Sequence, residues 1–584
     1  MKRFLLPALF FPVLALASVD YRVEIEGVQN SATRKSIRAS SRLVSLEKRP
    51  VSSINALRYR AHSDIPEIRK VLRAAGYYEP KIAVKIDGTS RKLGGALVTI
   101  EIEPGPLYTF GEYTLEISAH FPDLTAEKLG VIKGESALSE KVVASEKELL
   151  SYLANSGYPL AKIVSSSYVV SGKTKRLNIT EKVELGPLCT FGPTTLTGLH
   201  SVEEQLVKQH LAWREGEIYS AEKVDQTQKV LLKTGVFTSV FIENKPDEKL
   251  GEKEALPIAI EMTESKHKTI NIGASYQTFF GPGVTFGWEN RNLGGMARKL
   301  SVQGEITRVS HTGVATLLLP DIHTIGQDYT IQFKAVYEDL TAYLVHSYSL
   351  ENRFDKKIGK KFQFSIGVVL QELDLLNSVK NGRYQLAEVP VYLRWSSADS
   401  LLNPTKGNSF EYRITPSFTL APLSAPYLLQ GFSWSNYLSL LRSDTLVFAQ
   451  KITASSLLAE DLSDVAVSKR LFGGSEEEMR GYSYRTVSPL TSANKPIGGA
   501  SALYYTAELR FRPFKKVGFV PFFDIGTVQN RALPSFSGPW LRSAGLGLRY
   551  FSFIGPFRCD IAFPLDRRAI DPKYRILVSL GQTF

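Results

Sequence analysis

The second half of this sequence is a succession of segments in which apolar and polar residues alternate, separated by Gly, Pro, Asn and Asp. In residues 573–584 the two faces separate, with Tyr574, Ile576, Val578, Leu580 and Phe584 on one and Arg575, Ser579, Gly581 and Thr583 on the other. A period of two is that of a β-strand whose faces meet different surroundings. The pattern predicts an extensive antiparallel sheet from about Lys266 to Phe584.

No segment after the N-terminus reaches the roughly eighteen apolar residues that a membrane-spanning helix needs. If this chain crosses a membrane, it must therefore do so as a closed β-barrel, in which every backbone group is paired. A soluble β-sandwich has the same period and is the alternative. We count sixteen segments, an even number as in single-chain bacterial barrels, near 267–278, 282–292, 297–309, 311–320, 328–342, 345–358, 361–375, 382–398, 407–419, 427–440, 445–458, 500–513, 517–529, 541–552, 555–566 and 573–584.

The N-terminus has the organisation of a secretory signal peptide. The chain begins with the basic pair Lys2-Arg3, continues with an apolar stretch from Phe4 to Ala17, and offers the small-x-small sequence ALA at 15–17. Such a stretch is too short to cross a bilayer comfortably. We expect residues 1–17 to direct export and to be removed.

Charge and cysteine content exclude several classes of function. The formal net charge is +13, but the basic residues are spread along the chain, which indicates a surface facing solvent and lipid headgroups and no nucleic-acid partner. Cys189 and Cys559 lack C-x-x-C spacing, so we expect neither a disulfide framework nor a zinc site. No nucleophile elbow, phosphate-binding loop or H-x-x-x-H motif is present. We therefore predict no enzyme activity, no cofactor and no metal site.

The first half contains an internal repeat. Residues 103–111 (EPGPLYTFG) and 184–192 (ELGPLCTFG) agree at seven of nine positions with an offset of 81. The pairs Gly76-Tyr77 and Gly157-Tyr158 recur at the same offset. A period of this size indicates tandem domains rather than a single fold.

Each repeat unit reads as a helix, a glycine and two strands. In the first, a helix is expected from Asp64 to Ala75 with Asp64 as its N-cap. In the third, residues 231–240 follow the pattern L-x-x-x-G-x-F-x-x-V. These features resemble POTRA domains, and we expect three β-α-α-β-β modules at 18–106, 107–187 and 188–265, followed by a barrel at 266–584. The resemblance implies a periplasmic arm whose strand edges pair with extended segments of other chains.

A loop of about forty residues interrupts the alternating segments between Leu458 and Ala500, where roughly two to six residues are usual. It contains Arg480, and a guanidinium removed from water is costly unless it is paired. Asp524, in the F-x-D-x-G hairpin at 522–526, alternates with apolar neighbours and would face the lumen. We predict that Arg480 pins the loop inside the barrel against Asp524, with Glu508 nearby.

The loop and hairpin motifs together resemble the BamA/TamA superfamily of outer-membrane proteins. The loop motif is Gly473, Gly474, Gly481 and Tyr482 around Arg480, and the hairpin motif is Phe522 and Gly526 around Asp524. The sequences GWENRNL at 287–293, GLGLR at 545–549 and IGPFRCDIA at 554–562 fit the same superfamily. Met479 departs from the commoner Val or Ile. Three modules and this length are most similar to the TamA members, which implies α+β POTRA domains in tandem followed by a sixteen-stranded antiparallel transmembrane β-barrel.

The last strand resembles the C-terminal signal of outer-membrane proteins, with Gln582 where an apolar residue is usual. Closure of the barrel requires this strand to pair with the first, near Ile270 to Gln277. We expect this closure to form a weak seam, with the residues Ile270, Ile272, Val578, Leu580, Gly581 and Phe584.

The resemblance implies an outer-membrane translocation and assembly factor with its POTRA domains in the periplasm. Its expected partners are a TamB-type periplasm-spanning protein, nascent outer-membrane proteins and the lipid bilayer, with insertion through a laterally opening seam. Phospholipid transport to the outer membrane with TamB stays open as an alternative. A two-partner-type secretion pore is a further alternative, but such pores carry two modules and a plug helix. A BamA-like hub normally carries five modules.

Overall fold

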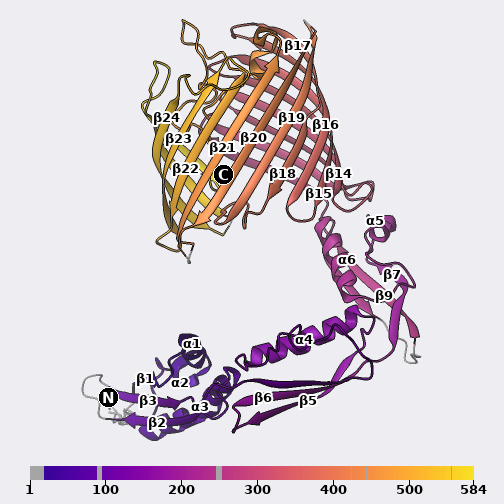
Figure 1. Cartoon of the computed structure of the whole chain (residues 1–584), viewed down its shortest axis with the longest axis vertical. Helices are drawn as coiled ribbons and strands as arrows, with labels where there is room; N and C mark the ends of the chain where they lie inside the picture. The colour runs from indigo at the N-terminus through magenta and orange to yellow at the C-terminus, as the bar shows by residue number, and fades with distance from the viewer. Residues whose placement is uncertain (1–18, 89–94, 245–252, 423, 442–443, 554) are drawn as a thin grey trace, which may run out of the picture. The chain divides into compact units, whose positions relative to one another are not determined.

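The computed structural model describes residues 19–88, 95–244, 253–422, 424–441, 444–553 and 555–584. The expected signal peptide, residues 1–17, lies outside the described residues. The chain forms two compact units: residues up to 195 belong to the first, residues from 261 onward belong to the second, and the stretch between is divided between them. Figure 1 labels the elements. No helix in the described part of the chain is long and apolar enough to cross a membrane.

Three small sheets form the POTRA modules, in the orders β1-β3-β2, β4-β6-β5 and β7-β9-β8. In the first two modules, the first strand pairs in parallel with the third: β1 with β3, and β4 with β6. The elements are β1 (Tyr21–Glu26), α1 (Ser31–Ser40), α2 (Arg42–Ser45), α3 (Ile54–Ala74), β2 (Lys81–Asp87), β3 (Ala96–Glu103), β4 (Thr109–Glu116), α4 (Ser139–Asn155), β5 (Lys162–Ser171), β6 (Arg176–Glu184), β7 (Leu188–Thr197), α5 (Glu204–Gln209), α6 (Ala221–Lys233), β8 (Phe237–Asn244) and β9 (Lys253–Glu264).

The repeated sequence forms the joint between successive modules. Gly76 and Gly157 end helices with φ of 89° and 97°, a conformation that glycine adopts without steric cost. The carbonyl of Gly76 accepts a hydrogen bond from Tyr108 N at 2.9 Å, and that of Gly157 accepts one from Cys189 N at 2.8 Å. The same bond therefore links the first module to the second and the second to the third.

Two expectations for the modules were wrong. Between β4 and β5, all of which the structure describes, α4 is the one α-helix, because Gly130 and Gly134 adopt positive φ and break the chain into turns. In the first module the helix begins at Ile54, with Ser53 as its N-cap. Asp64 is buried inside this helix and instead accepts hydrogen bonds from the backbone N–H groups of Arg42 and Leu43. It thus caps α2, not its own helix.

The second half forms one antiparallel sheet of seventeen strands, β10 to β26. Its strands are β10 (Lys268–Gln277), β11 (Gly281–Leu293), β12 (Arg298–Thr307), β13 (Ser310–Leu319), β14 (Gln327–Asp339), β15 (Leu344–Ile358), β16 (Phe362–Leu376), β17 (Gly382–Glu388), β18 (Val391–Ser396), β19 (Gly407–Ala421), β20 (Ala425–Ser439), β21 (Leu446–Ala459), β22 (Ser501–Phe511), β23 (Val517–Gln529), β24 (Leu541–Ser552), β25 (Gly555–Pro564) and β26 (Arg575–Leu580).

β17 and β18 occupy one position in the barrel wall. Both pair with β16 on one side and with β19 on the other. The break falls at Val389-Pro390, and proline lacks the N–H that a continuous ladder needs. The seventeen strands therefore fill sixteen positions, which agrees with the sixteen alternating segments in the sequence.

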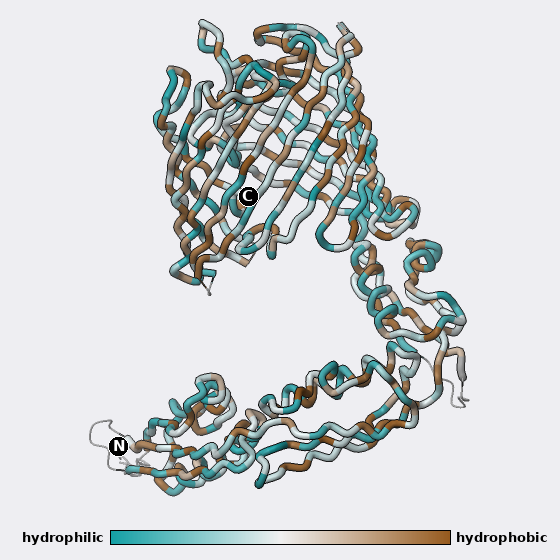
Figure 2. The backbone as a smooth tube through the Cα atoms, viewed as in Figure 1, coloured by the Kyte–Doolittle hydropathy of each residue, from teal (hydrophilic) through white to brown (hydrophobic). Residues whose placement is uncertain are grey.

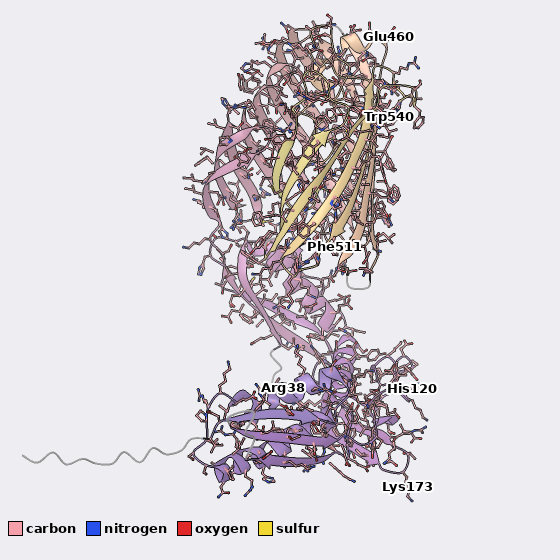
Figure 3. The ribbon with its side chains drawn as sticks, turned by 90° about the vertical axis from the view of Figure 1, so that its left-hand side faces the viewer. Arg38, His120, Lys173, Glu460, Phe511 and Trp540 are labelled. Atoms are coloured by element: carbon pink, nitrogen blue, oxygen red, sulfur yellow. The ribbon has the colours of Figure 1, made fainter. Side chains whose placement is uncertain are left out.

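Alternation along the strands separates an outer apolar face from an inner polar one. Figure 2 shows hydrophobic residues recurring along the strands, and Figure 3 shows side chains projecting from the wall, with Phe511 and Trp540 toward opposite ends of the strands. On β25, Phe557 and Ile561 are 45% and 37% exposed, whereas Arg558 and Asp560 are buried. An outward apolar face of this kind suits contact with lipid.

The first and last strands barely meet. Among the described residues, β26 has no ladder with β10, and Val578 N donates one hydrogen bond to Thr278 Oγ1 at 3.1 Å. The expected pairing near Ile270 to Gln277 was therefore wrong. β26 has only six residues, because the chain turns away from the wall at Gly581, where φ is 95°, so little edge is left that could pair.

Candidate functional site

The long loop between β21 and β22, residues 460–500, is folded into the barrel by apolar contacts at two places. Val465, Ala466 and Val467, next to the short 3₁₀ segments Leu462–Asp464 and Val467–Lys469, are buried against the inner wall from β15 to β21. Met479 and Tyr482 are buried against β22 and β23. These contacts hold the loop inside the barrel and place Arg480 in the lumen, where it is fully buried.

Arg480 makes a bidentate ion pair with Asp524 of β23. Its Nη2 donates to Asp524 Oδ1 at 2.7 Å, and its Nε donates to Oδ2 at 3.1 Å. The backbone N–H of Arg480 donates to the same Oδ2 at 3.0 Å. Both side chains are at most 1% exposed. A planar guanidinium held in this way fixes orientation as well as position.

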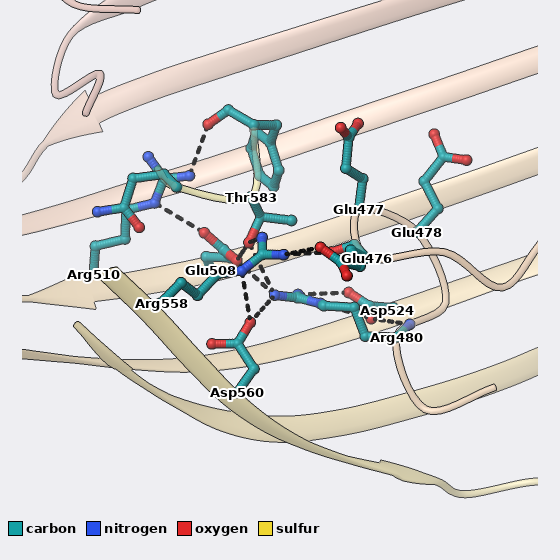
Figure 4. Close-up of polar contacts among 12 residues, drawn as sticks. Glu476, Glu477, Glu478, Arg480, Glu508, Arg510, Asp524, Arg558, Asp560 and Thr583 are labelled. Carbon is teal, nitrogen blue, oxygen red and sulfur yellow. Dashed lines mark hydrogen bonds and ion pairs between the residues drawn. The ribbon is translucent and has the colours of Figure 1, made fainter. Parts of the chain in front are cut away.

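The third nitrogen of the guanidinium reaches two further strands and the segment after β26 (Figure 4). Nη1 of Arg480 donates to Glu508 Oε1 on β22 at 2.7 Å and to Thr583 Oγ1 at 3.2 Å. It also lies 3.4 Å from Asp560 Oδ2 on β25. One loop residue thus contacts β22, β23, β25 and the segment after β26. The structure brings together the three residues of the expected clasp, Arg480, Asp524 and Glu508.

The clasp belongs to a larger buried set of charges. Arg510 Nε donates to Glu508 Oε2 at 2.9 Å, and Arg549 is bonded to Asp560. Four guanidinium groups and three carboxylates in this set are at most 6% exposed: Arg480, Arg510, Arg549, Arg558, Glu508, Asp524 and Asp560. The excess positive charge is met by Glu476 of the loop, 3.5 Å from Arg558. Because buried charges are costly unless paired, the set is stable only with the loop in place.

The hairpin and loop motifs pack around the guanidinium. Arg480 Cζ lies 3.4 Å from the ring centre of Phe522. Gly526 has no room for a side chain, because a Cβ there would lie 2.4 Å from Tyr504. Gly481 is equally confined, with a Cβ 2.7 Å from Pro564 N. These contacts explain why glycine stands at both positions.

The remaining loop motif residues lie on both sides of Arg480 and shape the fold of the loop. Tyr482 is fully buried, and its hydroxyl donates to Arg542 O at 2.9 Å. Gly473 exchanges two backbone hydrogen bonds with Val487, and Gly474 has a φ of 92°. The loop is therefore a folded structure with its own internal pairing.

The acidic triplet of the loop contacts two different parts of the wall. Glu477 Oε2 accepts a hydrogen bond from Lys451 Nζ on β21 at 3.0 Å, and Glu478 lies 3.7 Å from the same nitrogen. Glu476 faces Arg558 on β25. The triplet therefore fastens the loop on both sides of the buried clasp.

Residues 581–584 leave the wall and lie in the lumen. Gln582 Oε1 accepts from Arg549 Nε at 2.9 Å, and Thr583 Oγ1 donates to Glu508 Oε1 at 2.6 Å. Phe584 stacks on Tyr437 with a centre-to-centre distance of 6.1 Å. The sequence pattern that placed Phe584 on the lipid face was therefore wrong, because Gly581 turns the chain inward. Gln582 is polar because it binds lumenal groups.

The other residues expected at the seam face outward. Ile270 and Ile272 of β10 are 66% and 78% exposed, and Val578 and Leu580 of β26 are 42% and 48% exposed. They line the outer surface on the two sides of the gap in the ladder. Both edges thus present apolar side chains where lipid would be.

Several residues of the buried charge set were missed from the sequence: Arg510, Arg549, Arg558, Asp560 and Thr583. A signal was available, since each charged member alternates with outward apolar residues on its strand, as Asp560 does between Cys559 and Ile561. Charged residues at inward positions of a barrel strand are candidates for lumenal pairing. Thr583 had no such signal, because its place depends on the turn at Gly581.

A separate carboxylate fastens the third module near the barrel. The backbone N–H groups of His200, Ser201 and Val202 donate to Glu264 Oε1 at 2.7–2.9 Å. Burial acts to raise the pKa of Glu264, but these bonds and one from the Ser201 hydroxyl lower that pKa to about 2. Asn292 Nδ2 on β11 donates to Ser201 O at 3.0 Å. This loop therefore links the last POTRA strand to the start of the barrel.

No group of three or more His, Cys, Asp or Glu side chains suited to a metal ion occurs in the described ranges. Cys189, which is buried, and Cys559, which is exposed, form no disulfide bond in the described part of the chain.

Comparisons with known proteins agree with this architecture. Residues 251–584 match the Omp85 superfamily domain, and residues 22–104 match the POTRA domain described as TamA domain 1. The outer membrane protein assembly factor BamA of Nitratidesulfovibrio vulgaris is 22% identical over 84% of this chain and 64% of its own length. BamA of Neorickettsia risticii is 21% identical over 80% of this chain and 65% of its own length. The chain thus spans just under two thirds of these curated relatives.

Among solved structures, BamA from Haemophilus ducreyi lacking POTRA domains 1–3 superposes with a TM-score of 0.68 at 18% identity. The alignment covers 80% of this chain and 99% of that one, and it shows a shared fold. With POTRA modules ahead of a barrel whose lumen holds a clasped loop, this chain belongs to the Omp85 superfamily, as a bacterial outer-membrane barrel with periplasmic POTRA domains.

Proposed function

We propose that this protein is an assembly and translocation factor, not an enzyme, that helps outer-membrane proteins to insert through its β10–β26 seam. The observation that carries the proposal is the missing ladder between these two strands. A strand edge with unpaired N–H and C=O groups is a template for another strand. A client strand pairing there would satisfy groups that are otherwise unpaired in lipid.

The height of the barrel wall also supports insertion of client proteins at the β10–β26 seam. β26 has six residues and β10 has ten, whereas β15, β16, β19 and β20 have fifteen each. A shorter wall forces lipid next to it to thin or disorder. Insertion at the seam would therefore meet a lower barrier than insertion elsewhere.

A crosslink across the seam tests the proposal. Cysteines replace Thr278 and Val578, because Thr278 Oγ1 and the backbone N of Val578 are 3.1 Å apart. The background carries Cys559→Ser, since Cys559 lies opposite Val578. A short thiol crosslinker should abolish assembly of a client barrel in reconstituted vesicles. The same crosslinker on a Trp395→Cys and Phe410→Cys pair, which lies across the intact β18–β19 ladder, should leave assembly unchanged. Full assembly with a completely closed seam would refute lateral opening.

We infer that the POTRA modules dock a TamB-type partner by strand pairing. The match of residues 22–104 to TamA domain 1 supports this, as does the position of β2 at the edge of its sheet. A photo-crosslinking residue in place of Lys85 on β2 should capture a co-expressed TamB-type protein. The same residue in place of Arg69, exposed on α3, should not. Equal capture at both positions would exclude edge pairing.

A secretion pore through the lumen is disfavoured by the buried charge set. Passage of a chain would require the loop to leave, which separates Arg480 from three carboxylates. Deletion of residues 472–490 separates the two mechanisms: a pore gains conductance and keeps transport, whereas a seam inserter loses assembly. Vesicles that carry labelled phospholipid test the lipid-transport alternative in the same preparation.

A further inference from the structure

The tip of the first hairpin contacts the long loop. This tip, residues 278–280, joins β10 to β11 at the end of β10 opposite to the one at which the chain enters the barrel. The rings of Phe279 and Phe280 each lie 5.3 Å from the ring of Tyr484, inclined by 44° and 65°. Aromatic rings at such distances attract one another beyond simple burial. The loop that carries Arg480 thus holds one side of the seam.

Arg575, the first residue of β26, contacts both the loop and the hairpin tip. Its Cζ lies 4.1 Å from the ring centre of Phe279, a cation–π geometry. Its Nη1 donates to Tyr482 O at 3.1 Å. One side chain from the last strand therefore connects the other side of the seam to the same loop segment.

This loop segment is itself fixed. Tyr482 is buried and bonded to Arg542 O, Gly481 is packed against Pro564, and Arg480 is clasped by Asp524. Tyr484 follows within two residues. Its ring is thus positioned by the lumenal clasp, although the ring acts at the seam.

We propose that Tyr484 and Arg575 form a latch that holds the tip of the first hairpin against the last strand. The latch takes the place of the missing ladder at this end of the seam, so that the position of the loop sets how readily the seam opens. This inference rests on the proposed function, since it names the device that would regulate the same seam.

The test measures how often the two edges meet. The reporter is the initial rate of crosslinking between Thr278→Cys and Val578→Cys, in outer membranes, with Cys189→Ala and Cys559→Ser to remove the native thiols. Tyr484→Leu removes the ring contacts with Phe279 and Phe280, and Arg575→Gln removes the cation–π contact with Phe279. Each change should lower this rate about fivefold. Phe279→Leu removes the ring contact with Tyr484 and the cation–π contact with Arg575, without a change in β26 or the loop. It should lower the crosslinking rate at least as much.

The matched control is Arg413→Gln. Arg413 makes a cation–π contact of 5.5 Å with Tyr392, in the intact β18–β19 ladder, and its loss should not change the rate. Folding of each variant is checked by its heat-modifiable mobility. If folded Tyr484→Leu, Arg575→Gln and Phe279→Leu all crosslink at the parental rate, the latch does not exist.

Client assembly is measured on the same variants. A lower crosslinking rate with altered assembly supports both the latch and the seam mechanism. A lower rate with unaltered assembly keeps the latch and refutes the proposed use of the seam. The two proposals therefore fail by different readouts.

Discussion

Two neighbouring stretches of the barrel wall are held in opposite ways. From β22 to β25 the inner face carries a dense set of buried ion pairs centred on Arg480. Between β26 and β10 no ladder forms among the described residues, and aromatic and cation–π contacts at one end replace it. Because Thr583 ties the end of the last strand to the buried set, the last strand is the fixed edge. If the seam opens as proposed, we expect β10 to be the edge that moves.

Loss of Arg480 should have the largest effect on this contrast. Arg480→Ala leaves Asp524, Glu508 and Asp560 buried without their shared partner, and removal of one member of a buried pair costs about 3–5 kcal/mol. We expect the loop to leave the lumen and the unfolding temperature to fall strongly in heat-modifiability gels. The charge exchange of Arg480→Asp with Asp524→Arg should recover part of the loss.

Arg542 provides the matched control for Arg480. It also makes a bidentate pair, with Asp566, but its side chain is 52% exposed. Exposed ion pairs contribute little because solvent screens them, so Arg542→Ala should leave the unfolding temperature nearly unchanged. Equal effects at the two arginines would show that burial of the clasp does not matter.

Thr583→Val should have an intermediate effect. It removes the hydroxyl that donates to Glu508 and accepts from Arg480 and Arg558, and an unsatisfied buried polar group costs about 1–3 kcal/mol. The fixed edge should loosen while the loop stays in place. We expect the rate of proteolysis of the loop to equal that of the parent protein. Hydrogen exchange in β26 should be faster than in the parent.

Gly581→Ala should have a smaller effect. A Cβ there meets nothing closer than 3.8 Å, so the cost comes only from a φ of 95°, about 1 kcal/mol. Gly313→Ala is the control, because a Cβ there has nothing within 4 Å and φ is not positive. Equal stability of the two variants would mean that residues 581–584 do not need the turn.

The smallest effect is expected at Glu264, which lies outside the wall. Its pKa of about 2 is below the reference value of 4.5, so its carboxylate contributes stability above pH 4.5 that is lost as the pH falls through 2. Glu264→Gln retains an acceptor for the three N–H groups and should cost less than about 1 kcal/mol at neutral pH. Urea unfolding of the variant should show less acid dependence than the parent, with no change in seam crosslinking.

Local pattern was enough to predict the strands of the wall and the members of the clasp. Period-two alternation identified every wall position, including the interrupted one at β17 and β18, because a lipid-facing strand imposes that pattern directly. The pairing of Arg480 with Asp524 was predicted because burying an unpaired charge is costly. These arguments need only the residue and its immediate neighbours.

What could not be predicted depends on backbone geometry and on distant contacts. The inward turn at Gly581 follows from one dihedral angle, and it alone decides that Phe584 stacks on Tyr437 rather than facing lipid. Asp64 looked like a helix start, but it caps a different helix some twenty residues away. The latch at Tyr484 joins three segments that no periodicity connects.

The clasp also has a consequence for the order in which the protein folds. Arg480 and Thr583 are 103 positions apart, and contacts of long sequence separation form late because closing a long loop is entropically costly. Strands β22 to β26 must be in place before the guanidinium finds all its partners. Until then the charged side chains of the lumen lack some of their partners. We therefore expect docking of the loop to be a late step in the folding of the barrel.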